Sequence, residues 1–160
     1  MLGQRERITY LNISGGKVVK RTDRGQIQEF DFVEGTLERI YQRDREFRGE
    51  KVPYWYLDIK DPSTGELYSL GLRASSGVWR GLILSLGSCE NFLLPIRIEP
   101  YTRGDYDRVS VYSGGKKLDW VSDVPPVEEI EIGGQKLRSV QKREEFFSKI
   151  VDRINQTLQG

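Results

Sequence analysis

Tyrosines and arginines recur at alternate positions in the middle of the chain, and their types and spacing suit the binding of single-stranded nucleic acid. Binding with little sequence preference needs aromatic faces on which bases stack and cations that replace the counterions of the phosphates. Period-two alternation directs Leu57 and Ile59 to the core and therefore places Tyr54 and Tyr56 together on the outer face of one strand. On the expected partner strand, Gly71 leaves room for a base or a backbone to approach.

The other candidates come from the preceding strand and from the loops that flank this hairpin. The predicted nucleic-acid-binding residues are Arg39, Tyr41, Arg43, Arg45, Lys51, Tyr54, Tyr56, Arg73, Tyr101, Arg103, Tyr106 and Arg108. Between positions 39 and 51, five cations outnumber three carboxylates by two. Each tyrosine is equally compatible with packing beneath another part of the chain, and each arginine with a solvated surface of weak ion pairs. The hypothesis therefore depends on both residue types sharing one face.

The chain lacks the residue types on which most enzymes depend for catalysis. The chain has no histidine and a single cysteine, Cys89, so it cannot form a Ser-His or Cys-His pair, a His-ligated zinc site or an intrachain disulfide. Carboxylate clusters at 105–107 and 128–131 are interpreted as exposed acidic surface. We therefore expect a non-enzymatic protein with no catalytic residues, no cofactor and no metal. The charges of the 25 cations and 24 carboxylates nearly cancel, so the net charge indicates no class of binding partner.

No segment suggests a membrane or secretion. The first ten residues carry charges where a secretory signal is apolar, and no apolar run approaches the ~18 residues of a membrane-spanning helix. We expect a soluble protein in the cytoplasm, of a bacterial host cell if the protein is viral.

The composition and the turn residues predict a mainly β protein. A single alanine, 17 glycines and 11% aromatic residues favour strands over helices. The expected elements are an N-terminal hairpin (8–13 and 17–21), a long strand (28–43) with a bulge or sharp bend around Gly35, a loop (44–51), a hairpin (54–60 and 67–73), a helix (74–87) ended by a left-handed Gly87, a strand (92–99), a loop (100–107) and a hairpin (108–113 and 116–121).

The order of these elements matches a five-stranded Greek-key barrel with a helix between its third and fourth strands, which is the oligonucleotide/oligosaccharide-binding (OB) fold. An SH3-like barrel or an incomplete β-sandwich fits the strands, but neither expects that helix. We predict an OB-like barrel with its N-terminal hairpin over 1–121. Residues 122–160 are predicted to form a linker, a small hairpin around Gly133 and Gly134, and an amphipathic helix (141–158) docked on the barrel or on a partner.

Several stretches also resemble a known family. Residues 46–51 leading into 54–59, followed by 66–72 and 75–77, are similar to single-stranded-DNA-binding proteins of bacterial viruses, and so are 14–17, 116–120 and 144–147. The resemblance implies an OB fold that binds single-stranded DNA during phage-type replication or recombination, with replication or recombination proteins as further partners. Unlike many cellular single-strand binders, the sequence ends in 156–160 without an acidic tail.

A second hypothesis is a protein-interaction or virion-assembly module that docks through the barrel and the C-terminal amphipathic helix. The near-zero net charge favours it. A hydrolase with paired carboxylates is a third. The sequence leaves open the preference for DNA or RNA and the oligomeric state, because stacking distinguishes the sugars poorly.

Overall fold

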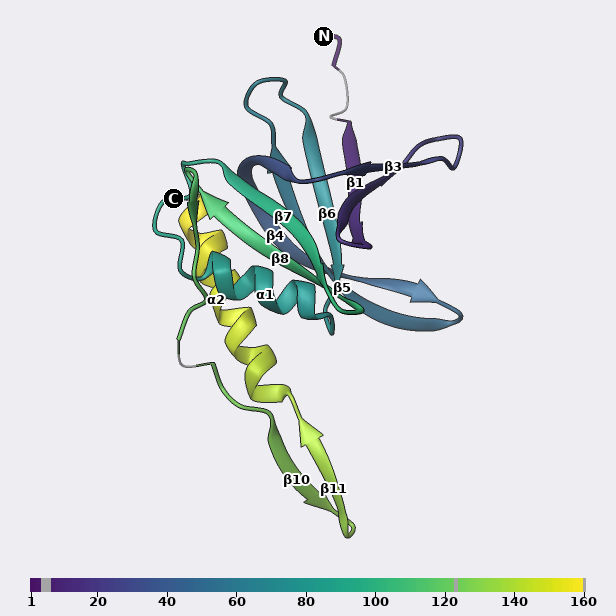
Figure 1. Ribbon diagram of the computed structural model, residues 1–160, viewed down its shortest axis with the longest axis vertical. Helices are drawn as coiled ribbons and strands as arrows, with labels where there is room; N and C mark the ends of the chain where they lie inside the picture. Colours follow the sequence, from purple (N-terminus) through teal and green to yellow (C-terminus); the bar gives the residue numbers. More distant parts are fainter. Residues whose placement is uncertain (4–6, 123, 160) are drawn as a thin grey trace.

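The computed structural model describes residues 1–3, 7–122 and 124–159, and these residues form a mainly β protein with two α-helices (Figure 1). The elements are β1 (Ile8–Ser14), β2 (Lys17–Arg21), β3 (Ile27–Phe30), β4 (Val33–Phe47), β5 (Glu50–Lys60), β6 (Leu67–Arg73), α1 (Gly77–Leu86), β7 (Ile96–Arg103), β8 (Tyr106–Ser113), β9 (Lys116–Lys117), β10 (Glu128–Ile132), β11 (Gln135–Ser139) and α2 (Gln141–Gln159). Asp123, within the expected linker, lies outside the described residues, as do residues 4–6 and 160.

Nine strands form one sheet in the order β3-β2-β1-β6-β5-β4-β7-β8-β9. The pair β1–β6 is parallel and the other pairs are antiparallel. Since β6 pairs with β1 and β8 pairs with β7 and β9, the ladder does not close into the expected barrel of five strands. The mainly β class, the N-terminal hairpin and the helix after the third strand of the central group are confirmed.

The long strand β4 links the two parts of the sheet, because its start pairs with β7 and its remainder with β5. The link depends on a glycine at position 35, because a Cβ atom there would lie 2.5 Å from the carbonyl oxygen of Lys60 and would push the two strands apart. The expected single strand over 28–43 is in fact two strands, β3 and β4. The register shift lies between Leu37 and Arg39, two residues beyond Gly35, whereas Gly35 marks the point at which β4 passes from pairing with β7 to pairing with β5.

The two expected loops, 44–51 and 100–107, are strands joined by tight turns. Arg48 and Gly49 both adopt positive φ (53° and 80°), which is the backbone of a two-residue hairpin turn whose twist matches that of the strands. The charges that suggested a loop lie on an exposed two-stranded ribbon, which needs no apolar face. Further along, β7 starts only at Ile96, β9 spans two residues, and Gly87 is right-handed (φ −61°) and not left-handed as predicted.

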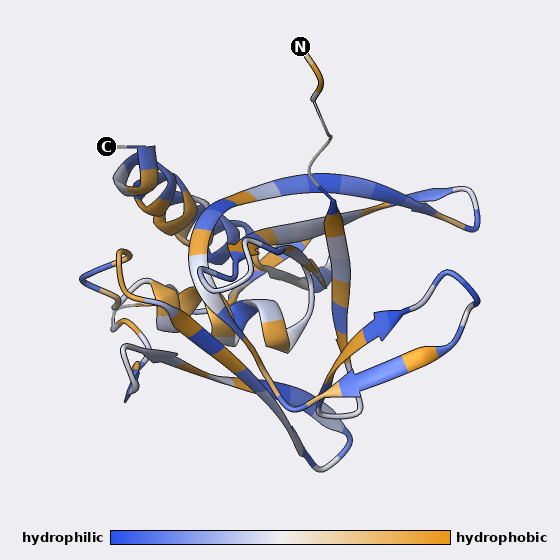
Figure 2. Ribbon diagram, turned by 90° about the horizontal axis from the view of Figure 1, so that it is seen from above, coloured by the Kyte–Doolittle hydropathy of each residue, from blue (hydrophilic) through white to orange (hydrophobic). Residues whose placement is uncertain are grey.

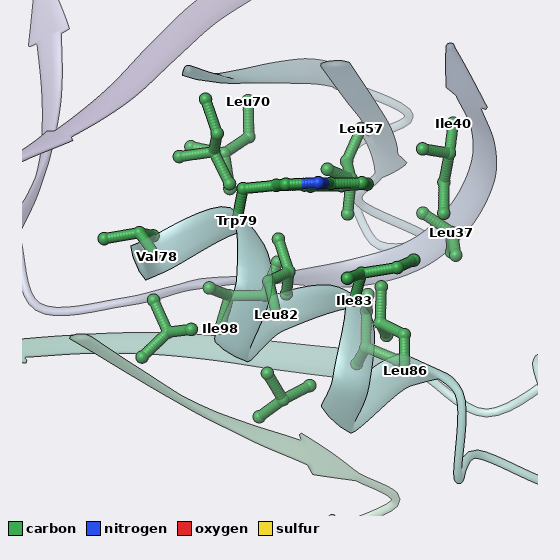
Figure 3. Packing of buried hydrophobic residues seen from close by; sticks show 14 of the residues in the cluster. Leu37, Ile40, Leu57, Leu70, Val78, Trp79, Leu82, Ile83, Leu86 and Ile98 are labelled. Carbon is green, nitrogen blue, oxygen red and sulfur yellow. The ribbon is translucent and has the colours of Figure 1, made fainter. Parts of the chain in front are cut away.

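The core lies between the sheet and α1. Figure 2 shows that hydrophobic and hydrophilic residues alternate along the strands that surround this helix. Trp79 of α1 is 1% exposed, stacks on Trp55 at 4.7 Å between ring centroids, and lies among Leu57 and Leu70 of the sheet (Figure 3). Ser76 caps α1 by accepting a hydrogen bond from the Trp79 amide. This packing fixes β5 and β6, whose outer faces carry the predicted site.

Helix α2 packs on β4 and α1 through Phe147, Ile150, Val151 and Ile154, which are all buried. Asn155 fastens it, because its side-chain amide donates to the Ile40 carbonyl (2.8 Å) and accepts from the Ile40 amide (3.0 Å). The hairpin β10–β11 forms a separate two-stranded sheet that projects away from the body (Figure 1). Of the helices in the described ranges, none is long and apolar enough to cross a membrane.

Candidate nucleic-acid interface

The outer face of β4, β5 and β6 gathers the central candidates. In the sheet register Tyr41 is opposite Tyr56, Arg43 is opposite Tyr54, and Tyr54 is in turn opposite Arg73. Residues directly opposite each other in a sheet point to the same face. The alternation of the sequence therefore becomes a two-dimensional patch of rings and guanidinium groups across three strands.

The tyrosines of this patch form a continuous stack, which we call the tyrosine ladder (Tyr41, Tyr56 and Tyr54). The ring centroids of Tyr41 and Tyr56 are 5.4 Å apart and those of Tyr56 and Tyr54 are 6.3 Å apart, with interplanar angles of 18° and 29°. A Cβ on Gly71 would lie 2.8 Å from the Tyr56 ring, so this ring lies on the Gly71 backbone. The space predicted at Gly71 for a base is therefore filled by Tyr56.

Three arginines of β4 lie against the ladder. The guanidinium of Arg39 is 4.3 Å from the centroid of the Tyr41 ring, that of Arg43 is 5.7 Å from the same ring, and that of Arg45 is 4.9 Å from the Tyr54 ring. These are cation–π distances, so the rings hold the charges on the outer face. Burial raises the pKa of Tyr56 above its ordinary value.

The ladder forms one wall of a groove whose opposite wall is the N-terminal hairpin. A first hollow of about 520 Å³ is lined by Tyr10, Leu11, Asn12, Val19, Arg21, Ile27, Tyr41, Arg43, Arg45, Tyr56 and Gly71. A second hollow of about 410 Å³ is lined by Asn12, Ile13, Arg45, Tyr54, Gly71, Leu72, Arg73, Ser76, Gly77, Val78, Asp105, Tyr106, Asp107 and Arg108. Because the two share Asn12, Arg45 and Gly71, they are neighbouring parts of one groove, which we call the trough.

The trough is positively charged. Its lining includes five arginines (Arg21, Arg43, Arg45, Arg73 and Arg108) and two carboxylates (Asp105 and Asp107), an excess of three cations. One of these carboxylates is engaged, because Asp107 accepts a 2.6 Å hydrogen bond from the amide of Gly16 in the N-terminal hairpin. A groove with an excess of cations attracts a polyanion, although the protein as a whole is nearly neutral.

The structure brings eight of the twelve predicted residues to this trough. They are Tyr41, Arg43, Arg45, Tyr54, Tyr56, Arg73, Tyr106 and Arg108. Arg39 lies beside it, with its Nε 2.6 Å from the buried carboxylate of Asp58. Lys51 is at the far end of the β4–β5 ribbon, opposite Glu46. Tyr101 and Arg103 are on β7, where Tyr101 lines a separate hollow, so the expected convergence of all twelve residues does not occur.

Sequence reasoning missed the wall that the N-terminal hairpin supplies, namely Tyr10, Asn12 and Arg21. Tyr10 is 59% exposed, and the alternation of Tyr10 and Asn12 with Leu11, which is buried, was a readable signal that they share an outer face. The missing information was the parallel pairing of β1 with β6, which places that face beside Gly71.

A further hollow of about 510 Å³ lies outside the trough and has a different character. It is lined in part by Phe30, Phe32 and Tyr68, and its charged residues are Lys20 and three carboxylates, Glu34, Asp61 and Glu66. Burial and a hydrogen bond to Glu66 raise the pKa of Tyr68 to about 12. This excess of negative charge does not suit a polyanion, so the trough is the candidate site.

Comparison with known proteins assigns neither a family nor a function to the chain. No family model, no curated protein and no solved structure matches the chain.

Proposed function

We propose that this protein binds single-stranded DNA in the trough, with little sequence preference and without catalysis, in phage-type DNA replication or recombination. The observation that carries the proposal is the joining of the tyrosine ladder and five arginines in one groove. Rings and cations together meet the two requirements of sequence-tolerant binding, since bases stack on rings and guanidinium groups replace the counterions of the phosphates.

The arrangement of the strands supports the same proposal. The series β4, β5, β6, α1, β7, β8 has the order of an OB fold, with its helix after the third strand. OB folds bind oligonucleotides on their second and third strands, between the first–second and fourth–fifth strand loops. Here those are β5 and β6, flanked by the β4–β5 ribbon and the β7–β8 turn. We propose an OB-like core of five strands, of the type found in phage single-strand binders, extended on β6 by the N-terminal hairpin.

The exposed rings favour a single strand over a duplex. Tyr10 and Tyr106, on either side of the ladder, are 59% and 67% exposed and line the trough. Their faces can stack only on bases that are not already stacked and paired within a double helix. A duplex would offer its phosphates alone, so it would use the arginines and leave the rings without partners.

A second candidate function is a protein-interaction module, and one observation favours it. Ile130 and Ile132 of the projecting β10–β11 hairpin are 40% and 59% exposed. The apolar stripe of α2, which the sequence offered for such docking, is covered by the protein's own body. This candidate would use the hairpin and leave the charged trough without a role.

Fluorescence anisotropy of labelled oligothymidine at low salt tests the proposal. We expect saturable binding to the single strand, weaker binding to duplex, and an oligouridine arm that reports any sugar preference. Tyr54→Ala removes one ring, worth about 1–3 kcal/mol per base, and should weaken binding about 5- to 150-fold. Tyr112→Ala, on a tyrosine that lines a hollow elsewhere, is the matched control and should bind normally. Absence of saturable binding at low salt would refute the proposal.

A further inference from the structure

A second aromatic hollow adjoins the trough at Arg108. This hollow, of about 300 Å³, is lined by Tyr101 and Trp120 together with residues of α1 and β8, and Arg108 lines both it and the trough. Tyr101 is directly opposite Arg108 in the β7–β8 register. The guanidinium of Arg108 is 5.4 Å from the centroid of the Tyr106 ring in the trough, and the same residue lines the second hollow.

The position of Arg108 is fixed by its surroundings. Its Nη1 donates a 3.0 Å hydrogen bond to the Asp107 carbonyl, and a Cβ on Gly77 would lie 2.7 Å from the same nitrogen. The guanidinium therefore occupies the space that the glycine leaves at the start of α1. A phosphate bound at Arg108 would lie where the trough meets the second hollow.

The two rings of the second hollow are open to solvent on a fixed backbone. Tyr101 is 45% exposed and Trp120 is 53% exposed. The Trp120 ring rests on α1, where a Cβ on Gly81 would be in ordinary contact at 3.5 Å. The residues on either side of Trp120 are tied to the end of α1, since the Val121 amide donates to the Leu84 carbonyl (3.0 Å) and the Ser88 hydroxyl donates to the Asp119 carbonyl (2.6 Å).

We propose that a single strand bound in the trough continues past Arg108 and stacks its next bases on Tyr101 and Trp120, which we call the outer platform. The inference depends on the proposed function and extends the strand's path onto the β7–β8 side of the molecule. The hollow is lined by two cations, Arg108 and the exposed Lys117, and by one carboxylate, Asp119. This excess of one cation and the continuity through Arg108 favour a polyanion as the occupant. The exposed rings of Tyr101 and Trp120 favour stacking with the bases of that polyanion.

Tryptophan fluorescence can isolate this platform. Of the chain's three tryptophans, Trp79 is 1% exposed and Trp55 stacks on it, half-buried, so Trp120 is the one open to a ligand. We would titrate the protein with oligothymidines of about 6 and about 16 nucleotides, within the ~4–16 nucleotides that OB folds occupy. Anisotropy reports binding of both, whereas tryptophan quenching reports the outer platform.

We expect both oligonucleotides to bind and the longer one alone to quench the emission. Trp120→Ala and, independently, Tyr101→Ala should weaken the longer oligonucleotide at least about 5-fold, from one stacking contact, and leave the shorter unchanged. Trp120→Phe keeps a ring and should retain the affinity while abolishing the quenching. Binding of the longer oligonucleotide with no quenching and no loss in either alanine variant would overturn the outer platform but leave the trough. Failure of both oligonucleotides to bind would overturn the proposed function itself.

Discussion

Arg43 and Arg45 offer the sharpest test of how the trough binds. Both line it, and in the part of the chain that the structure describes neither guanidinium pairs with a carboxylate. Their contacts with phosphates would therefore add to the free energy of binding without first breaking an ion pair. Replacing both in Arg43→Ala/Arg45→Ala removes two cations and leaves the three tyrosine rings of the ladder in place.

The expected size follows from counterion release. For a single strand, the logarithm of the association constant changes with the logarithm of salt by about −0.7 per phosphate contact. If each of the five arginines in the trough contacts one phosphate, the slope is about −3.5, so a fourfold rise in salt weakens binding about 100-fold. With three arginines left, the slope is about −2.1 and the same rise weakens binding about 20-fold.

The assay is an oligothymidine titration by anisotropy at four or more salt concentrations. The slope of the logarithm of the association constant against the logarithm of the salt concentration is fitted for wild type and for the variant. Lys136→Ala/Lys149→Ala removes two exposed cations that line neither part of the trough and is the matched control, with an unchanged slope. Parallel salt dependences for wild type and the arginine variant, beside measurable binding, would show that the strand lies elsewhere. That result would refute the reasoning from the lining residues.

Three further predictions concern the framework. Asn155→Ala leaves the amide and carbonyl of Ile40 without their side-chain partner and should lower the free energy of unfolding by about 1–3 kcal/mol in urea denaturation; an unchanged midpoint would show that packing alone holds α2. Gly35→Ala forces a Cβ to within 2.5 Å of the Lys60 carbonyl oxygen and should cost about 1–3 kcal/mol by the same measurement; a neutral result would mean that the strands separate freely there. The pKa of Tyr68 is raised to about 12 in the folded protein from its ordinary value of about 10, so the stability that it contributes is complete below pH ~10 and is lost as the pH rises to ~12. Tyr68→Phe should flatten the dependence of the free energy of unfolding on pH over this range. The same dependence in wild type and variant would contradict the raised pKa.

Local periodicity was sufficient to predict the centre of the candidate site. Alternation alone puts Tyr54 and Tyr56 on one face, because a strand's side chains point to opposite sides in turn. The spacing of apolar residues over 74–87 likewise predicts α1, whose Ser76 cap and buried face need only neighbours in the chain. These predictions succeed because each depends on contacts a few residues apart.

Contacts distant in the chain account for what the sequence did not predict. The pairing of Ile8 with Leu67 joins two strands between which β2, β3, β4 and β5 lie in the chain, and no local pattern shows that it occurs or that it is parallel. The contribution of Tyr10 to the trough follows from this pairing. Gly71 illustrates the same limit, since its missing side chain predicts an open space but not that the Tyr56 ring fills it.

Photocrosslinking tests most directly whether the trough is the binding site. A bromodeoxyuridine-substituted single strand is bound to the full chain, irradiated, and the modified peptides are identified by mass spectrometry. The account predicts crosslinks on the tyrosine ladder and on Tyr106, which line the groove together with its arginines. Crosslinks confined to α2 or to the β10–β11 hairpin, with the ladder unmodified, would contradict it.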